Sequence, residues 1–244
     1  MNIIVCLKQV PDGVPSIINP EEKNALEAAL VLKDNQCAHV TVVTMGPPQA
    51  EKSLREALSM GADEAILLSD TVFAGADTLS TSNALAGVMG KLDYDIIFTG
   101  RESIDGNTAQ VGPKLAERLG ITQVTYVEDI MSIDGDTLKI KKALEDGYEI
   151  LTVKTPVLLT AIKELNTPRY INMSNVFEAF KKEIKLWNAD DIGIDKSLLG
   201  LSGSATKVFK SWTEEVTVRG QVVDLPFKEA ASYITSKLKE KHII

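Results

Sequence analysis

Short β-branched segments alternate with helical patterns over the first 120 residues. This alternation restricts the possible fold classes more than any other feature of the sequence. The segments are nearly continuous in apolar character, which is typical of strands buried on both faces. They lie at residues 3–5, 39–44, 65–68 and 94–98, and helical patterns lie at 20–33, 48–60, 77–91 and 108–119. The alternation predicts right-handed crossovers and therefore an α/β fold with a doubly wound, mostly parallel sheet.

The residues at the expected helix ends support these boundaries. Asn19 is followed by a proline and has Glu22 three residues on, which is close to a capping box. Asp77 is a favourable N-cap for the helix that follows it. Gly61 and Gly120 occupy positions where two of these helices are expected to end.

The pattern changes after residue 120. Alternating segments separated by turn residues predict an antiparallel extension of the sheet. These segments lie at residues 123–127, 138–141 and 148–153, and a further buried strand is expected at 156–162. The extension distinguishes this chain from a purely parallel α/β protein.

The last part of the chain shows no domain pattern and ends in an amphipathic helix at about residues 226–240. A stretch of chain that packs so little against itself cannot bury much apolar surface against one domain. We therefore expect an α/β nucleotide-binding domain over residues 1–185 and a C-terminal arm over 186–244 that packs on a partner subunit. The alternative is a tail that folds back over its own sheet.

Composition and rare residue types exclude several functions. The net charge of −8 disfavours nucleic acid, because phosphate backbones require a basic face. Cys6 and Cys37 belong to no CxxC or Cys/His cluster, so neither a metal site nor a disulfide is expected. With only His39 and His242 there is no Ser-His-Asp arrangement, and no catalytic side chain is expected. The start lacks a basic leader and no apolar run spans a bilayer, so we expect a cytoplasmic protein without membrane insertion.

Two loops at strand ends are candidates for ligand binding. Residues 99–112 follow the fourth expected strand and open a helix, and residues 73–82 occupy the same position after the third. In open α/β sheets ligands bind at the carboxyl ends of strands, and the free amides of a helix start suit a phosphate. Thr108 and Gln110 supply side-chain donors and Asp105 an acceptor. The alternative is that both loops only cap their helices.

Several motifs together resemble the β (small) subunit of electron-transfer flavoproteins. They are VCLKQVP at residues 5–11, NP at 19–20 before ALEAAL, MGPPQA at 45–50, ALSMGAD at 57–63, DGNTAQVGP at 105–113 and LNTPRY at 165–170. The set covers nearly the whole chain. The resemblance implies the adenine-nucleotide-binding type of doubly wound fold, in a heterodimer with an α subunit that carries a flavin.

The resemblance offers two cofactors for the crevice. The plain branch of the family holds AMP, and the bifurcating branch holds a second FAD. FAGADTL at residues 73–79 and DGxTAQVG at 105–112 resemble the bifurcating branch, so FAD is expected, with AMP as the alternative. The implied cofactor-binding residues are Cys6, Asn19, Met45, Phe73, Ala76, Thr78, Leu79, Gly100, Arg101, Asp105, Gly106, Asn107, Thr108, Ala109, Gln110 and Val111.

The mechanism that the resemblance implies is electron bifurcation. NADH reduces the FAD held here, one electron passes through the partner's flavin to an acyl-CoA or hydroxy-acid dehydrogenase, and the other reduces ferredoxin. The chain is then an electron-carrier subunit without side-chain catalysis. A non-redox nucleotide-binding regulatory module is the alternative of another class.

The dehydrogenase is expected to dock at residues 170–181. Met173 occupies the place of the family's protruding leucine, and Asn175, Val176 and Phe177 follow it. The alternative is a surface helix whose Val176, Phe177 and Phe180 pack on the core. The loop between Pro11 and Asn19 is shorter than the family's.

Overall fold

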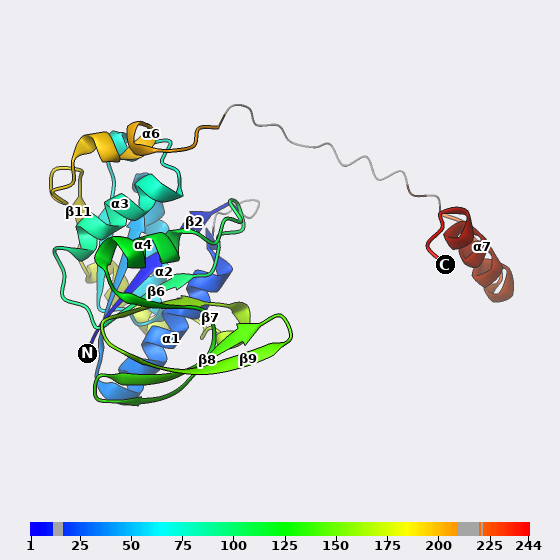
Figure 1. Ribbon diagram of the computed structural model, residues 1–244, viewed down its shortest axis with the longest axis horizontal. Coiled ribbons are helices and arrows are strands. Elements are labelled where there is room, and N and C mark those ends of the chain that lie inside the picture. The colour runs from blue at the N-terminus through cyan, green and yellow to red at the C-terminus, as the bar shows by residue number, and fades with distance from the viewer. Residues whose placement is uncertain (12–16, 209–219, 221) are drawn as a thin grey trace. The chain divides into compact units, whose positions relative to one another are not determined.

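The computed structural model describes residues 1–11, 17–208, 220 and 222–244 (Figure 1). The loop between Pro11 and Asn19, which was expected to be short, falls mostly outside them. The chain forms two compact units, Met1–Lys207 and Val208–Ile244. The expected boundary at residue 185 falls inside β11 (Ile184–Trp187), which pairs with the sheet of the first unit.

Within the described residues, one large sheet of nine strands runs in the order β11-β5-β4-β1-β6-β10-β7-β8-β9. Its strands are β1 (Asn2–Leu7), β4 (His39–Met45), β5 (Glu64–Leu68), β6 (Ile96–Gly100), β7 (Thr122–Asp134), β8 (Thr137–Leu144), β9 (Gly147–Lys154), β10 (Val157–Ala161) and β11. Pairing is parallel from β11 to β7 and antiparallel from β7 to β9. The mostly parallel sheet and its antiparallel extension are confirmed. A separate antiparallel pair joins β2 (Gln9–Val10) to β3 (Ile17–Ile18).

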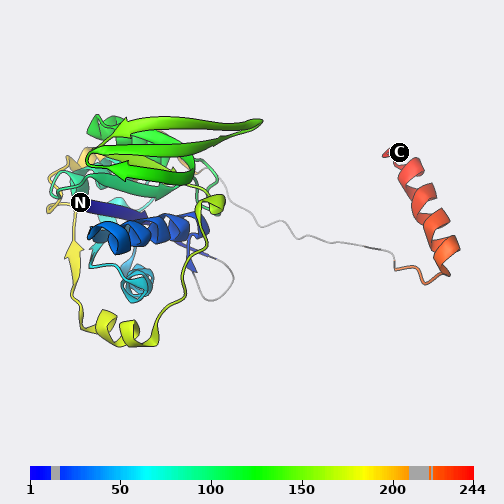
Figure 2. The same ribbon diagram turned by 90° about the horizontal axis from the view of Figure 1, so that it is seen from below.

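Helices cover both faces of the sheet (Figures 1 and 2), which confirms the doubly wound arrangement. One face is covered by α1 (Pro20–Gln36), α2 (Glu51–Met60) and α5 (Met173–Lys181), and the other by α3 (Thr78–Met89), α4 (Val111–Leu119) and the short α6 (Gly200–Gly203). The second unit contains α7 (Phe227–Glu240).

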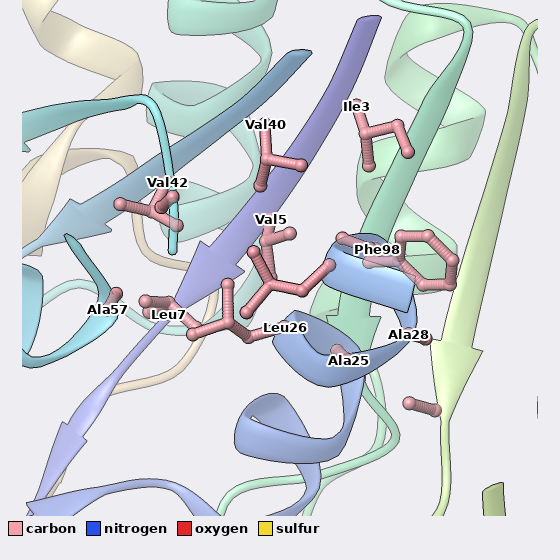
Figure 3. Packing of buried hydrophobic residues seen from close by; sticks show 14 of the residues in the cluster. Ile3, Val5, Leu7, Ala25, Leu26, Ala28, Val40, Val42, Ala57 and Phe98 are labelled. Carbon is pink, nitrogen blue, oxygen red and sulfur yellow. The ribbon is translucent and has the colours of Figure 1, made fainter. Parts of the chain in front are cut away.

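The central strand β1 shows why the buried segments lack alternation. Successive side chains point to opposite faces, and both faces are covered. Val5 and Leu7 pack in the core cluster beneath α1, whereas Ile4 and Cys6 pack in the cluster beneath α3 and α4. Figure 3 shows Val5 and Leu7 facing Leu26 of α1. All five buried positions of β1, residues 3–7, are therefore apolar.

The helix ends agree with the sequence in part. Gly61 and Gly120 end α2 and α4 with positive φ, and Asp77 caps α3 by accepting from the amides of Leu79 and Ser80, as predicted. The capping box of α1 was a wrong prediction, because the side chain of Asn19 makes no cap hydrogen bond. The start of α4 at residue 108 was also wrong, because a left-handed residue precedes the helix at position 109.

Candidate functional site

The sheet has a topological switch point at β1, which pairs with β4 on one side and β6 on the other. The connecting helices α1 and α3 lie on opposite faces. The chain therefore diverges at the carboxyl ends of β1 and β6, which is where open α/β sheets bind ligands. The residues after β1 and the loop of residues 101–110 after β6 lie at this edge.

Asn19, the residue before α1, makes two side-chain hydrogen bonds to the loop after β6. Its Nδ2 donates to the carbonyl oxygen of Glu102 at 2.8 Å, and its Oδ1 accepts from the amide of Ile104 at 3.1 Å. The side chain is fully buried. Glu21 adds a bond, because its carboxylate accepts from the amide of Glu102 at 3.0 Å. Both polar ends of Asn19 are thus engaged in positioning this loop.

Lys8 makes a second attachment. Its ammonium lies 2.7 Å from both oxygens of Asp105 and 3.3 Å from the hydroxyl of Ser103. Partial burial raises the pKa of Asp105, but the hydrogen bonds from Lys8 and Ser103 outweigh it and hold that pKa below its usual range. Sequence reasoning did not select Lys8 as a site residue. The sequence feature that could have identified Lys8 is its position directly after the central strand β1.

Several backbone amides before α4 have no acceptor among the described residues. Asn107 and Ala109 have φ angles of 45° and 54°, in the left-handed region that residues with a Cβ rarely adopt. Within the described part of the chain, the amides of Thr108, Ala109 and Gln110 donate to no protein atom. These amides adjoin the N-terminus of α4, where the helix dipole favours an anion. Gly106 precedes them in the same loop.

The two candidate loops meet through side chains. The hydroxyl of Thr78, at the start of α3, lies 2.9 Å from Oε1 of Gln110. Lys114 donates to both, at 2.7 Å to the hydroxyl and 3.0 Å to the amide oxygen. The starts of α3 and α4 are therefore joined around one cation. Lys114 was missed because one of its two partners, Thr78, lies on another helix.

Three of the predicted cofactor residues, Cys6, Met45 and Phe73, form an apolar surface at the carboxyl edge of the sheet, here called the apolar floor. Cys6 and Phe73 are buried in one core cluster, and Met45 packs against it half-buried. Ala76 and Leu79 are half-buried residues of the second loop, and Gly100 ends β6. Burial, followed by the nearby Glu22, raises the pKa of the Cys6 thiol well above its usual range. The thiol therefore stays protonated and behaves as a small apolar group.

Four buried polar atoms of the described residues have no hydrogen-bond partner. Within the described residues they are Ser80 Oγ, Asn83 Oδ1, Thr99 Oγ1 and Arg101 Nε. Such atoms are rare in folded proteins. Arg101 directs its Nη2 to Glu102 and Glu21, at 2.7 and 3.1 Å, and its guanidinium lies over the ring of Tyr126 at 5.7 Å from the centroid. Thr99 and Arg101 flank the last residue of β6.

The residues predicted for docking lie on α5. Met173 is 72% exposed and Phe177 68% exposed, while Ala179 is buried against the rest of the unit. Phe180 is also 68% exposed, so the alternative in which Phe177 and Phe180 pack on the core is wrong. Asn175 and Val176 are half-buried. The reason is that α5 packs against α2 with the side that carries Ala179, which leaves the large side chains exposed to solvent.

Other features lie away from the predicted cofactor residues. A cavity of about 550 Å³ between α2 and β11 contains none of them. Among the described residues, no group of three or more His, Cys, Asp or Glu side chains is placed to hold a metal ion. No helix in the described ranges is long and apolar enough to cross a bilayer.

Comparison with known proteins gives one consistent family. The model of the electron transfer flavoprotein domain matches residues 7–192. The chain is 64% identical to an electron transfer flavoprotein subunit beta of Clostridium acetobutylicum, 48% identical to the caffeyl-CoA reductase-Etf complex subunit CarD of Acetobacterium woodii, and 40% identical to the acryloyl-CoA reductase electron transfer subunit gamma of Anaerotignum propionicum. Each alignment covers 100% of both chains.

Proposed function

This chain belongs to the electron transfer flavoprotein family, in which it is a β subunit, and from this we propose that it binds FAD at the carboxyl edge of its sheet and serves in electron bifurcation. The observation that carries the proposal is the junction of the two candidate loops at Thr78, Gln110 and Lys114. A ligand at this junction contacts the starts of two helices at once, which suits an anionic dinucleotide.

The residues present fit such a cofactor. The free amides at residues 108–110 and the cation of Lys114 suit its phosphates. The small residues Ala74, Gly75 and Ala76 leave room for a flat ring system, and Cys6 and Phe73 provide an apolar floor. Bound FAD would supply hydride acceptance from NADH and release of the two electrons separately, one through the α subunit's flavin and one to ferredoxin.

The partners follow from the same assignment. The α subunit is the expected partner of the second unit, where Phe227 and Ile234 of α7 are 96% and 58% exposed. The exposed Met173 and Phe177 of α5 form the proposed contact with the dehydrogenase. Two relatives are named for reductases of caffeyl-CoA and acryloyl-CoA, which favours an acyl-CoA dehydrogenase over a hydroxy-acid enzyme.

The test is to copurify the chain with its α subunit, denature the complex and quantify the FAD and AMP released per heterodimer. Two FAD and no AMP are expected. One FAD and one AMP would overturn the proposal and leave the chain with a structural nucleotide.

A matched pair of variants locates the second cofactor. Thr78→Val removes the hydroxyl that joins Gln110 and Lys114, and it is expected to lower the FAD content towards one per heterodimer. Thr152→Val, on the exposed part of β9, is expected to leave the content at two. Equal FAD content in both variants would place the second cofactor elsewhere.

A further inference from the structure

A late segment of the chain runs along the second candidate loop. The amide of Ala189 donates to Oδ2 of Asp70 at 3.2 Å, and the amide of Leu201 donates to the carbonyl of Ala74 at 3.0 Å. Asn83 of α3 in turn donates to the carbonyl of Leu198 at 3.1 Å. The late segment thus contacts the residues before the loop, the loop itself and the helix α3 that follows it. Its last part, residues 200–206, is here called the brace.

Asp77 is the point where the brace and the loop are joined most closely. Its own amide donates to the hydroxyl of Ser204 at 2.8 Å. Its Oδ2 accepts from both the amide and the hydroxyl of Thr206, at 2.9 and 3.1 Å, while Oδ1 caps α3. Burial raises the pKa of Asp77, but these hydrogen bonds outweigh it and lower that pKa to about 2. The carboxylate is therefore ionised and fully used by backbone and hydroxyl donors.

The contact is also sterically tight. A Cβ on Gly200, whose φ is 53°, would lie 1.8 Å from the carbonyl oxygen of Val72. A Cβ on Gly75, whose φ is 73°, would lie 3.3 Å from Cβ of Leu201. At position 200 only glycine allows the two backbones to approach so closely, and at position 75 a side chain would press on that of Leu201. The position of the loop is therefore fixed by the brace as well as by β5 and α3.

We propose that Ser204 and Thr206 are positioning residues of the cofactor site, which act by holding Asp77 in place. This inference rests on the proposed function, because residues 73–79 are taken to line the flavin. The brace ends two residues before Val208, where the second unit begins. The segment expected to bind the α subunit is therefore continuous in sequence with the segment that holds the loop.

The experiment uses the full chain in complex with its α subunit. The Ser204→Ala/Thr206→Val double variant removes the two hydroxyl bonds to Asp77 but keeps the amide of residue 206. Thr206→Ser retains its hydroxyl, and Ser202→Ala is the matched control on the exposed side of α6. For each variant we would measure the FAD dissociation constant, the flavin absorbance spectrum and hydrogen exchange of the amides of residues 73–80.

The double variant is expected to weaken FAD binding about tenfold, since two or three hydrogen bonds are lost. It should also shift the flavin spectrum and speed amide exchange in residues 73–80, while Thr206→Ser and Ser202→Ala behave as wild type. Unchanged exchange in the double variant would overturn the inference, whatever nucleotide is bound. A wild-type complex that contains AMP in place of the second FAD would overturn the proposed function instead, and exchange would still decide the role of the brace.

Discussion

The ammonium of Lys8 lies 2.7 Å from both carboxylate oxygens of Asp105, although 97 positions separate the two residues in the sequence. The pair ties the end of β1 to the loop after β6 on the two sides of the switch point. Because the amides at residues 108–110 follow directly in the same loop, the pair contributes to the position of the proposed phosphate contacts.

Lys8→Met should weaken nucleotide binding by about fivefold, because a partly exposed ion pair contributes up to about 1 kcal/mol. The control is Lys154→Met, which breaks the more exposed pair with Asp136 at the far end of the sheet. Nucleotide affinity of the heterodimer, measured by calorimetry, distinguishes the two. Equal affinity in Lys8→Met and wild type would show that the loop keeps its position without Lys8.

Glu22 should make stability depend on pH. Burial raises its pKa to about 8, against an ordinary value of about 4.3, although the amide of Lys8 donates to the carboxylate. Between these two pH values the folded protein keeps a proton that the unfolded chain releases, so stability falls as pH rises through this window. Glu22→Gln removes the titration. The thermal midpoint of the variant should therefore rise relative to wild type between pH 5 and pH 8, and a constant difference would contradict the assignment.

Gly112→Ala should displace α4 from the sheet. A Cβ at this position would lie 2.7 Å from Oγ1 of Thr99 and 2.9 Å from Cγ2 of Thr160. Such overpacking costs about 1–3 kcal/mol. Gly90→Ala is the control, because its nearest atoms would be 3.6 Å away. Denaturant unfolding should show destabilisation for the first variant and little change for the second; a stable Gly112→Ala protein would mean that α4 can shift freely.

Met173→Asp should impair electron transfer to the dehydrogenase. An apolar anchor at an interface contributes about 2 kcal/mol or more, so the KM for the dehydrogenase should rise at least about tenfold. Met131→Asp is the matched control, because Met131 is 46% exposed on β7. Reduction of the dehydrogenase, followed as a function of its concentration, gives the KM of each variant. Similar KM values for the two variants would place docking away from α5.

Much of the fold was predictable from local patterns. Strands buried on both faces require continuous apolar runs, and the glycines that end α2 and α4 supply positive φ angles. β11 was missed, because a four-residue edge strand with Lys185 and Leu186 exposed has no distinctive period. The two loops at the strand ends were selected because parallel strands bring their carboxyl ends to one edge.

The sequence by itself determined the α/β class, the family and the order of the elements other than β11. Tertiary structure decided which polar groups meet. Asn19 binds the loop after β6 instead of capping α1, Lys114 joins two helix starts, and Ser204 holds Asp77 across 127 positions. The physical reason is that periodicity and turn residues record the conformation of a few neighbouring residues, whereas these hydrogen bonds depend on how distant elements pack.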